Sequence, residues 1–110
     1  MRIKDNTINP RGITNELLLG ITISSMVYQK YGYCMRITSL CDGKHSATHS
    51  NHYGGNGADL GSKELRPEHK HRILNEIKRK LNNQYKIILE NEGKVMEHFH
   101  LAYKPKYQSN

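Results

Sequence analysis

The stretch that decides the fold spans residues 85–103 and reads YKIILENEGKVMEHFHLAY. Residues 85–89 form an apolar run of strand length, and residues 95–103 form a second run of strand length. The segment between the two runs is polar and contains Gly93, a residue typical of turns. We therefore predict that the two runs pair as a β-hairpin.

Two helices are predicted upstream of the hairpin. The first begins after Thr14, a good N-cap residue, and keeps helical spacing to about residue 30, with Gly32 as its stop signal. The second begins at Pro67, a residue suited to the first helical turn, and ends at Asn82. The leucine run 17–19 is assigned to the core, as is the apolar stripe of the second helix. That stripe consists of Ile73, Leu74, Ile77 and Leu81.

Two further strands are expected at residues 33–39 and 58–61, separated by a long polar segment. A loop of that length in so small a domain is usually functional. The 110 residues suffice for one compact domain, with residues 1–12 as an irregular lead and 104–110 as a loose tail. The predicted fold class is α+β, a small antiparallel sheet with helices packed on one face.

The chain carries 17 Lys and Arg against 10 Asp and Glu, a net charge of +7. That surplus favours an anionic partner such as nucleic acid, an anionic membrane face or an acidic wall polymer. No stretch approaches the roughly 20 apolar residues of a membrane span. Residues 1–11 lack the apolar region of a signal peptide. We expect a monomer that is made in the cytoplasm.

Two separate segments carry candidate metal ligands. Residues 50–59 read SNHYGGNGAD and place His52 and Asp59 at the two ends of a glycine-rich stretch. Residues 97–100 read EHFH, and residues two apart on a strand share a face, so His98 and His100 point the same way. Either histidine can complete a His–Asp–His set. Three protein ligands leave one zinc position open, as in catalytic sites.

A catalytic zinc site also needs acid–base and electrostatic partners. Bound zinc activates water near neutral pH, and a carboxylate must then take the proton. Glu97 is the candidate base, because it lies beside the ligands in sequence. Lys44, His45 and His98 are the candidate donors to the oxyanion.

The first segment, with Ser50, His52, Gly55 and Asp59, resembles the S-x-H-x-x-G-x-[small]-x-D motif of a zinc peptidase superfamily. The superfamily comprises D-alanyl-D-alanine carboxypeptidases and L-alanyl-D-glutamate endopeptidases, which share a fold with the hedgehog signalling domain. Residues 97–100 look like its C-terminal E/D-x-x-H motif in an H-x-H form. Residues 37–39 and 42–45, ITS and DGKH, are similar to a phage and viral subgroup. The match spans residues 35–103.

The resemblance implies a role for each matching residue. The metal ligands would be His52, Asp59 and His100. Glu97 would be the general base, Ser50 would steady the ligand loop, and His98 would contact the transition state or support a ligand.

One feature of the family is missing from this chain. Many members carry an arginine after the strand that matches residues 35–39, and here residues 40–42 read LCD. Lys44 or His45 could replace that arginine, or Arg36 could reach in from the strand.

The resemblance implies a zinc-dependent, phage-encoded lytic enzyme that hydrolyses stem-peptide bonds of peptidoglycan. It would be made in the host cytoplasm and act on the cell wall, without a stable nucleic-acid partner. The bond, D-Ala–D-Ala, L-Ala–D-Glu or a crossbridge, stays open, as does the choice between carboxypeptidase and endopeptidase. The main alternative is a small basic nucleic-acid-binding or nuclease protein, although the chain has no zinc-knuckle spacing. A zinc-containing binding module without catalysis is a third interpretation.

Overall fold

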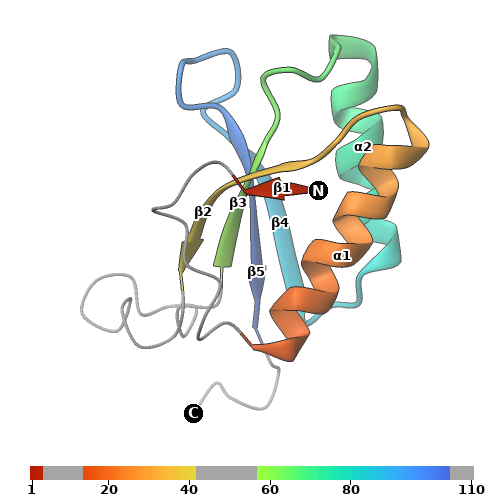
Figure 1. Ribbon diagram of the computed structural model, residues 1–110, viewed down its shortest axis with the longest axis vertical. Helices are drawn as coiled ribbons and strands as arrows, with labels where there is room; N and C mark the ends of the chain where they lie inside the picture. The colour runs from red at the N-terminus through yellow and green to blue at the C-terminus, as the bar shows by residue number, and fades with distance from the viewer. Residues whose placement is uncertain (4–13, 42–56, 105–110) are drawn as a thin grey trace.

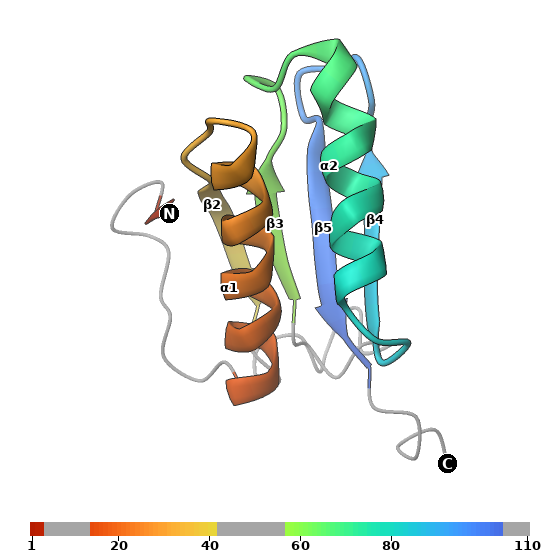
Figure 2. The ribbon, with the colours of Figure 1, turned by 90° about the vertical axis from the view of Figure 1, so that its right-hand side faces the viewer.

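The computed structural model describes residues 1–3, 14–41 and 57–104. These residues form two helices and five strands, and both helices lie against the same face of the sheet (Figures 1 and 2). In chain order the elements are β1 (Arg2–Ile3), α1 (Asn15–Lys30), β2 (Arg36–Cys41), β3 (Gly57–Gly61), α2 (Pro67–Lys80), β4 (Tyr85–Glu90) and β5 (His98–Tyr103). The predicted α+β class, with helices on one face, is confirmed. Neither helix has the length and apolar character needed to span a bilayer.

The strands of the described chain form one mixed sheet in the order β1-β2-β3-β5-β4. The pairs β2–β3, β3–β5 and β4–β5 are antiparallel, as predicted, whereas β1 runs parallel to β2. The expectation of a purely antiparallel sheet and of an irregular lead at residues 2–3 is therefore wrong. A two-residue strand is too short to show a periodic pattern, and its pairing rests on contacts such as Arg2 N–H donating to the Met35 carbonyl at 2.7 Å.

Helix α1 begins where its cap predicts, because the Thr14 hydroxyl accepts a hydrogen bond from the Leu17 N–H at 3.1 Å. Leu17 is fully buried, but Leu18 and Leu19 are 48% and 54% exposed. The assignment of the whole leucine run to the core is wrong, because successive helical residues point about 100° apart. The buried face of α1 instead includes Leu17, Ile21, Val27 and Tyr28.

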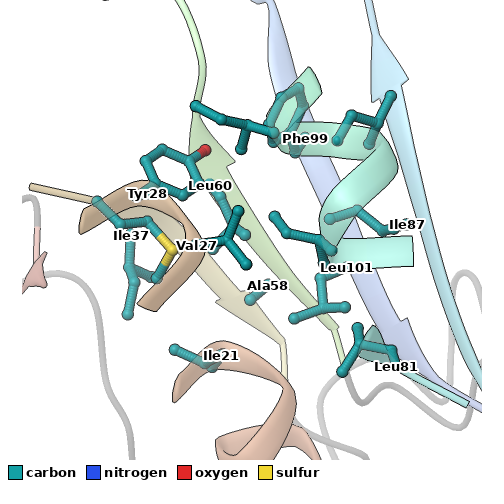
Figure 3. Close-up of a cluster of buried hydrophobic side chains, with 14 of the residues drawn as sticks. Ile21, Val27, Tyr28, Ile37, Ala58, Leu60, Leu81, Ile87, Phe99 and Leu101 are labelled. Carbon is teal, nitrogen blue, oxygen red and sulfur yellow. The ribbon is translucent and has the colours of Figure 1, made fainter. Parts of the chain in front are cut away.

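Helix α2 has Pro67 in its first turn and buries its predicted apolar stripe at Ile73, Leu74, Ile77 and Leu81. Figure 3 shows the core that results, in which side chains of both helices meet those of the sheet, including Leu60 of β3 and Phe99 and Leu101 of β5. Tyr28 also donates a hydrogen bond from its hydroxyl to the Gly61 carbonyl at 2.7 Å, which fixes α1 to the end of β3.

Strand β2 begins at Arg36, three residues later than the predicted start at residue 33. The residues before it close helix α1, where Gly32 has a φ of +91°. Tyr33 contacts the start of α2, since its hydroxyl accepts the Arg66 N–H and lies 2.8 Å from His69 Nδ1. The segment 33–35 therefore links α1 to β2, and its one bond to the described sheet is the Met35 carbonyl that accepts the Arg2 N–H.

Strand β5 begins at His98, whereas residue 95 was predicted. Residues 91–97 form the turn between β4 and β5, and Asn91 and Gly93 adopt positive φ values of 57° and 80°. Val95 and Met96 are 79% and 70% exposed, so they do not extend the hairpin. This longer turn places Glu97 just outside the strand.

Candidate metal centre

The candidate centre lies on the sheet face opposite the helices, built from β3 and β5. Side chains alternate along a strand, so the buried Ala58, Leu60, Phe99 and Leu101 face the helices. Asp59, His98 and His100 alternate with these residues along the two strands and face the other way. The antiparallel register pairs Asp59 with His100 and Gly61 with His98.

These three side chains come close enough to share one cation. Their ligand atoms all lie within 4.8 Å of one another. Oδ1 of Asp59 is 2.9 Å from His100 Nδ1 and 3.5 Å from His98 Nε2. The sequence left His98 and His100 as competitors for one ligand position, and the structure brings both to Asp59. All three side chains are partly buried.

His98 is oriented by its second ring nitrogen. Its Nδ1 lies 2.7 Å from the Met96 carbonyl oxygen, which can only accept, so Nδ1 carries a proton and donates. This leaves Nε2 directed at Asp59 and at Glu90, whose Oε1 is 2.8 Å away. Burial lowers the pKa of His98, but the Met96 contact and the two nearby carboxylates together raise it above its usual value.

Glu90 is a member of the site that sequence reasoning missed. It is the last residue of β4, and the hairpin register pairs it with His98, the first residue of β5. Its carboxylate is not one of the three clustered groups, yet it bonds one of them. It also lines the cavity of about 310 Å³ over the site, together with Ser39, Gly57, Ala58, Asp59, His98 and His100. The sequence could have predicted the contact of Glu90 with His98 only through the register of the hairpin. That register depends on where the turn begins and ends.

Gly57 provides the space for His100. A Cβ atom at position 57 would lie 3.2 Å from His100 Cε1 and 3.4 Å from the Leu101 carbonyl oxygen. Such a contact is tighter than side chains normally allow, so the ring would have to move. The last glycine of the motif therefore allows the close approach of the His100 ring to the backbone of β3.

Glu97 does not join the cluster. Its carboxylate accepts a hydrogen bond from the Ser62 hydroxyl at 2.6 Å, forms an ion pair with Lys70 at 2.8 Å and accepts the Gly93 N–H at 3.0 Å. Burial raises the pKa of Glu97, but these contacts outweigh it and lower the pKa to about 2. In the folded protein the Glu97 carboxylate is therefore ionised, and the ammonium group of Lys70 balances its charge.

The described structure bears on only one of the remaining predicted site residues, Arg36. Lys44, His45, Ser50 and His52 lie outside the described residues. Arg36, the candidate replacement for the family arginine, has its Nη2 4.0 Å from Glu64 Oε1 and does not line the cavity.

The donor set suits zinc. One carboxylate and two imidazoles are common zinc ligands, and catalytic sites use three protein ligands with one open position. The Met96 contact to His98 is the kind of outer hydrogen bond that fixes the tautomer of a ligating histidine.

Comparisons with protein-family models, curated proteins and solved structures found no match.

Proposed function

We propose that the chain is a zinc-dependent peptidase that hydrolyses stem-peptide bonds of peptidoglycan. The convergence of Asp59, His98 and His100 on the open face of the sheet carries the proposal, because it assembles ligands from the two separate sequence motifs. The motifs resemble those of the zinc D-alanyl-D-alanine carboxypeptidase and L-alanyl-D-glutamate endopeptidase superfamily. That resemblance supports a hedgehog-type arrangement and a phage lytic role. It also implies His52 as a ligand, which would take the place of one of the two strand histidines, so that three protein ligands still leave one zinc position open for water.

The residues around the centre fit a hydrolytic mechanism. Zinc supplies a Lewis acid and a water of lowered pKa when it is bound. Glu90 would be the general base and then the general acid of the hydrolysis, since its carboxylate lies beside His98 without being one of the three clustered groups. Asp59 and His100 hold their positions through their own 2.9 Å contact.

Peptidoglycan is proposed as the substrate because of the motifs and because of the net positive charge of the chain. A chain with a net charge of +7 is attracted to anionic polymers, and peptidoglycan with its acidic wall polymers is one of them. The same charge is the main support for the nucleic-acid alternative. The clustered Asp59, His98 and His100 count against a protein that only binds phosphates by charge. A metal-dependent nuclease would also use such a cluster, so it is the resemblance of the two motifs that favours the peptidase.

Digestion of purified peptidoglycan by the zinc-loaded protein tests the proposal. Mass analysis of the released muropeptides should show new termini at one type of stem-peptide bond, and it identifies that bond. Addition of a zinc chelator should abolish the cleavage. Intact muropeptides after exposure to the zinc-loaded protein would contradict the assignment. Tight DNA binding with a steep salt dependence would then favour the alternative.

A further inference from the structure

A buried carboxylate holds together three segments at the end of the sheet nearest the candidate centre. Glu97 is only 7% exposed and accepts hydrogen bonds from Ser62, which follows β3, and from Gly93 in the β4–β5 turn. It is also paired with Lys70 of α2 at 2.8 Å. Figure 2 shows this turn at the same end of the molecule as the start of α2.

The contact between Ser62 and Glu97 continues the pairing of β3 with β5. Gly61 and His98 form the last paired position of the two strands. Ser62 is the next residue along the first strand, and Glu97 is the preceding residue of the second. Their 2.6 Å side-chain hydrogen bond therefore holds the two strands together one position past the backbone ladder. These strands carry Asp59 and His98, so the bond helps to fix the distance between those candidate ligands.

The contacts of Glu97 also fix the turn that orients His98. Its Oε1 accepts the Gly93 N–H at 3.0 Å, and its own N–H donates to the Lys94 carbonyl at 3.1 Å. Met96 lies within the segment closed by these bonds, and its carbonyl accepts the Nδ1–H of His98 at 2.7 Å. A displaced turn would move that carbonyl, and the His98 ring would lose the partner that directs Nε2 at Asp59.

We propose that Glu97 is a positioning residue of the metal centre, which holds His98 in ligating geometry through Lys70 and Ser62. This inference rests on the proposed zinc site and reassigns the residue that the motif resemblance makes the base. Glu97 points to the helix side of the sheet, where its partners come from α2 and from the segment after β3. The carboxylate on the ligand side is Glu90.

A double-mutant cycle on zinc binding tests the proposal. The variants are Glu97→Gln, Lys70→Met and the two combined, each compared with the wild-type protein by zinc titration against a chelator. Each single change leaves one buried charge without its partner, so we expect a loss of zinc affinity of roughly 10–100-fold. The combined variant should lose less affinity than the product of the two single losses, because it removes both charges together.

The absorption spectrum of the cobalt-substituted protein separates positioning from catalysis. Glu97→Gln should change this spectrum, because the ligand geometry changes, whereas the exposed control Glu92→Gln should leave it as in wild type. If Glu97→Gln keeps wild-type zinc affinity and an unchanged spectrum but loses hydrolysis, Glu97 acts in the chemistry and the proposal is wrong. If the wild-type protein itself binds no zinc, the proposed function fails, and the inference fails with it.

Ser62→Ala gives a milder test should Glu97→Gln fail to fold, as circular dichroism will show. It removes one hydrogen bond from an uncharged donor and leaves the Lys70 ion pair in place. We expect it to fold, with a reduced zinc affinity and a changed cobalt spectrum. Wild-type affinity together with a wild-type spectrum in this variant would overturn the positioning role.

Discussion

Two glutamates seven residues apart have different surroundings, and this difference supports the different roles proposed for them. Glu97 is buried and ionised against Lys70, with a pKa of about 2, so it is poorly suited to carry a proton near neutral pH. The Glu90 side chain is 41% exposed and contacts His98 on the ligand side of the sheet. Position beside a ligand in the sequence therefore did not predict position beside the ligand in space.

Replacement of Glu90 by Gln should remove turnover but keep the metal. We expect kcat to fall roughly 10²–10⁴-fold, which is the usual contribution of a general base. Zinc content should stay as in wild type, because Glu90 is not one of the three clustered groups. Peptidoglycan hydrolysis and metal analysis on the same preparation measure both effects.

Glu92→Gln is the matched control for this prediction. Glu92 lies two residues further along and is paired with His71 of α2, with its side chain 56% exposed. The variant should keep wild-type activity. Full activity in Glu90→Gln, with the control also active, would show that another group takes the proton.

At the scale of the elements, local signals predicted most of the helices and strands. Thr14 as a cap, Pro67 in a first turn and the apolar stripe of α2 each depend on residues within a few positions. One failure is local, the exposure of Leu18 and Leu19, and the others involve distant residues. The pairing of β1 with β2, and of Lys70 with Glu97, requires the folded chain, and no pattern along the sequence reports it.

The same limit applies to the candidate site. Asp59 and the two histidines could be singled out, because their residue types and their spacing of two on a strand are local features. Glu90 could not, because its place beside His98 depends on a turn whose end the sequence misplaced by three residues. Register, which one residue in a turn can shift, is the least local property of a sheet.

Removal of the Thr14 cap should destabilise the protein by about 1 kcal/mol, the usual cost of replacing an N-cap threonine with alanine. Thr14→Ala leaves the Leu17 N–H without its side-chain acceptor. Chemical denaturation measures the free energy of unfolding.

Thr22→Ala on the same helix is the control, because the Thr22 hydroxyl only bonds back to the Leu18 carbonyl at the exposed surface. Its free energy of unfolding should be close to that of wild type. If the two changes had equal effects on the free energy of unfolding, the Thr14 cap would not stabilise the helix.

At the scale of the whole molecule, the sheet separates the residues of the apolar core from the candidate metal ligands. The two helices and the apolar core occupy one face (Figures 1 and 3). The alternation of side chains along β3 and β5 puts the candidate centre on the other face. The Lys70–Glu97 pair joins the two sides, since it ties α2 to the turn that precedes His98. Loss of that pair should therefore affect both unfolding and metal binding.

The acid sensitivity of folding should report the same pair. The pKa of Glu97 is lowered from 4.5 to about 2 in the folded protein. The ionised carboxylate therefore contributes stability above pH 4.5, and this contribution is lost as the pH falls toward 2. At about 1.4 kcal/mol per pKa unit, the full contribution is about 3 kcal/mol.

Urea unfolding of the metal-free protein at pH 7 and pH 3 measures this loss. Glu97→Gln has no carboxylate to protonate, so its free energy of unfolding should fall less than that of wild type between the two pH values. An equal fall in both proteins would show that Glu97 is not stabilised by its ionised form.

The central claim is that Asp59, His98 and His100 hold a zinc ion, and the zinc content of the purified protein tests it most directly. We predict about one zinc per wild-type chain, as for a single mononuclear site. Asp59→Ala should bind markedly less zinc while circular dichroism shows that it stays folded. A folded wild-type protein without zinc, or an Asp59→Ala variant with undiminished zinc, would contradict the account.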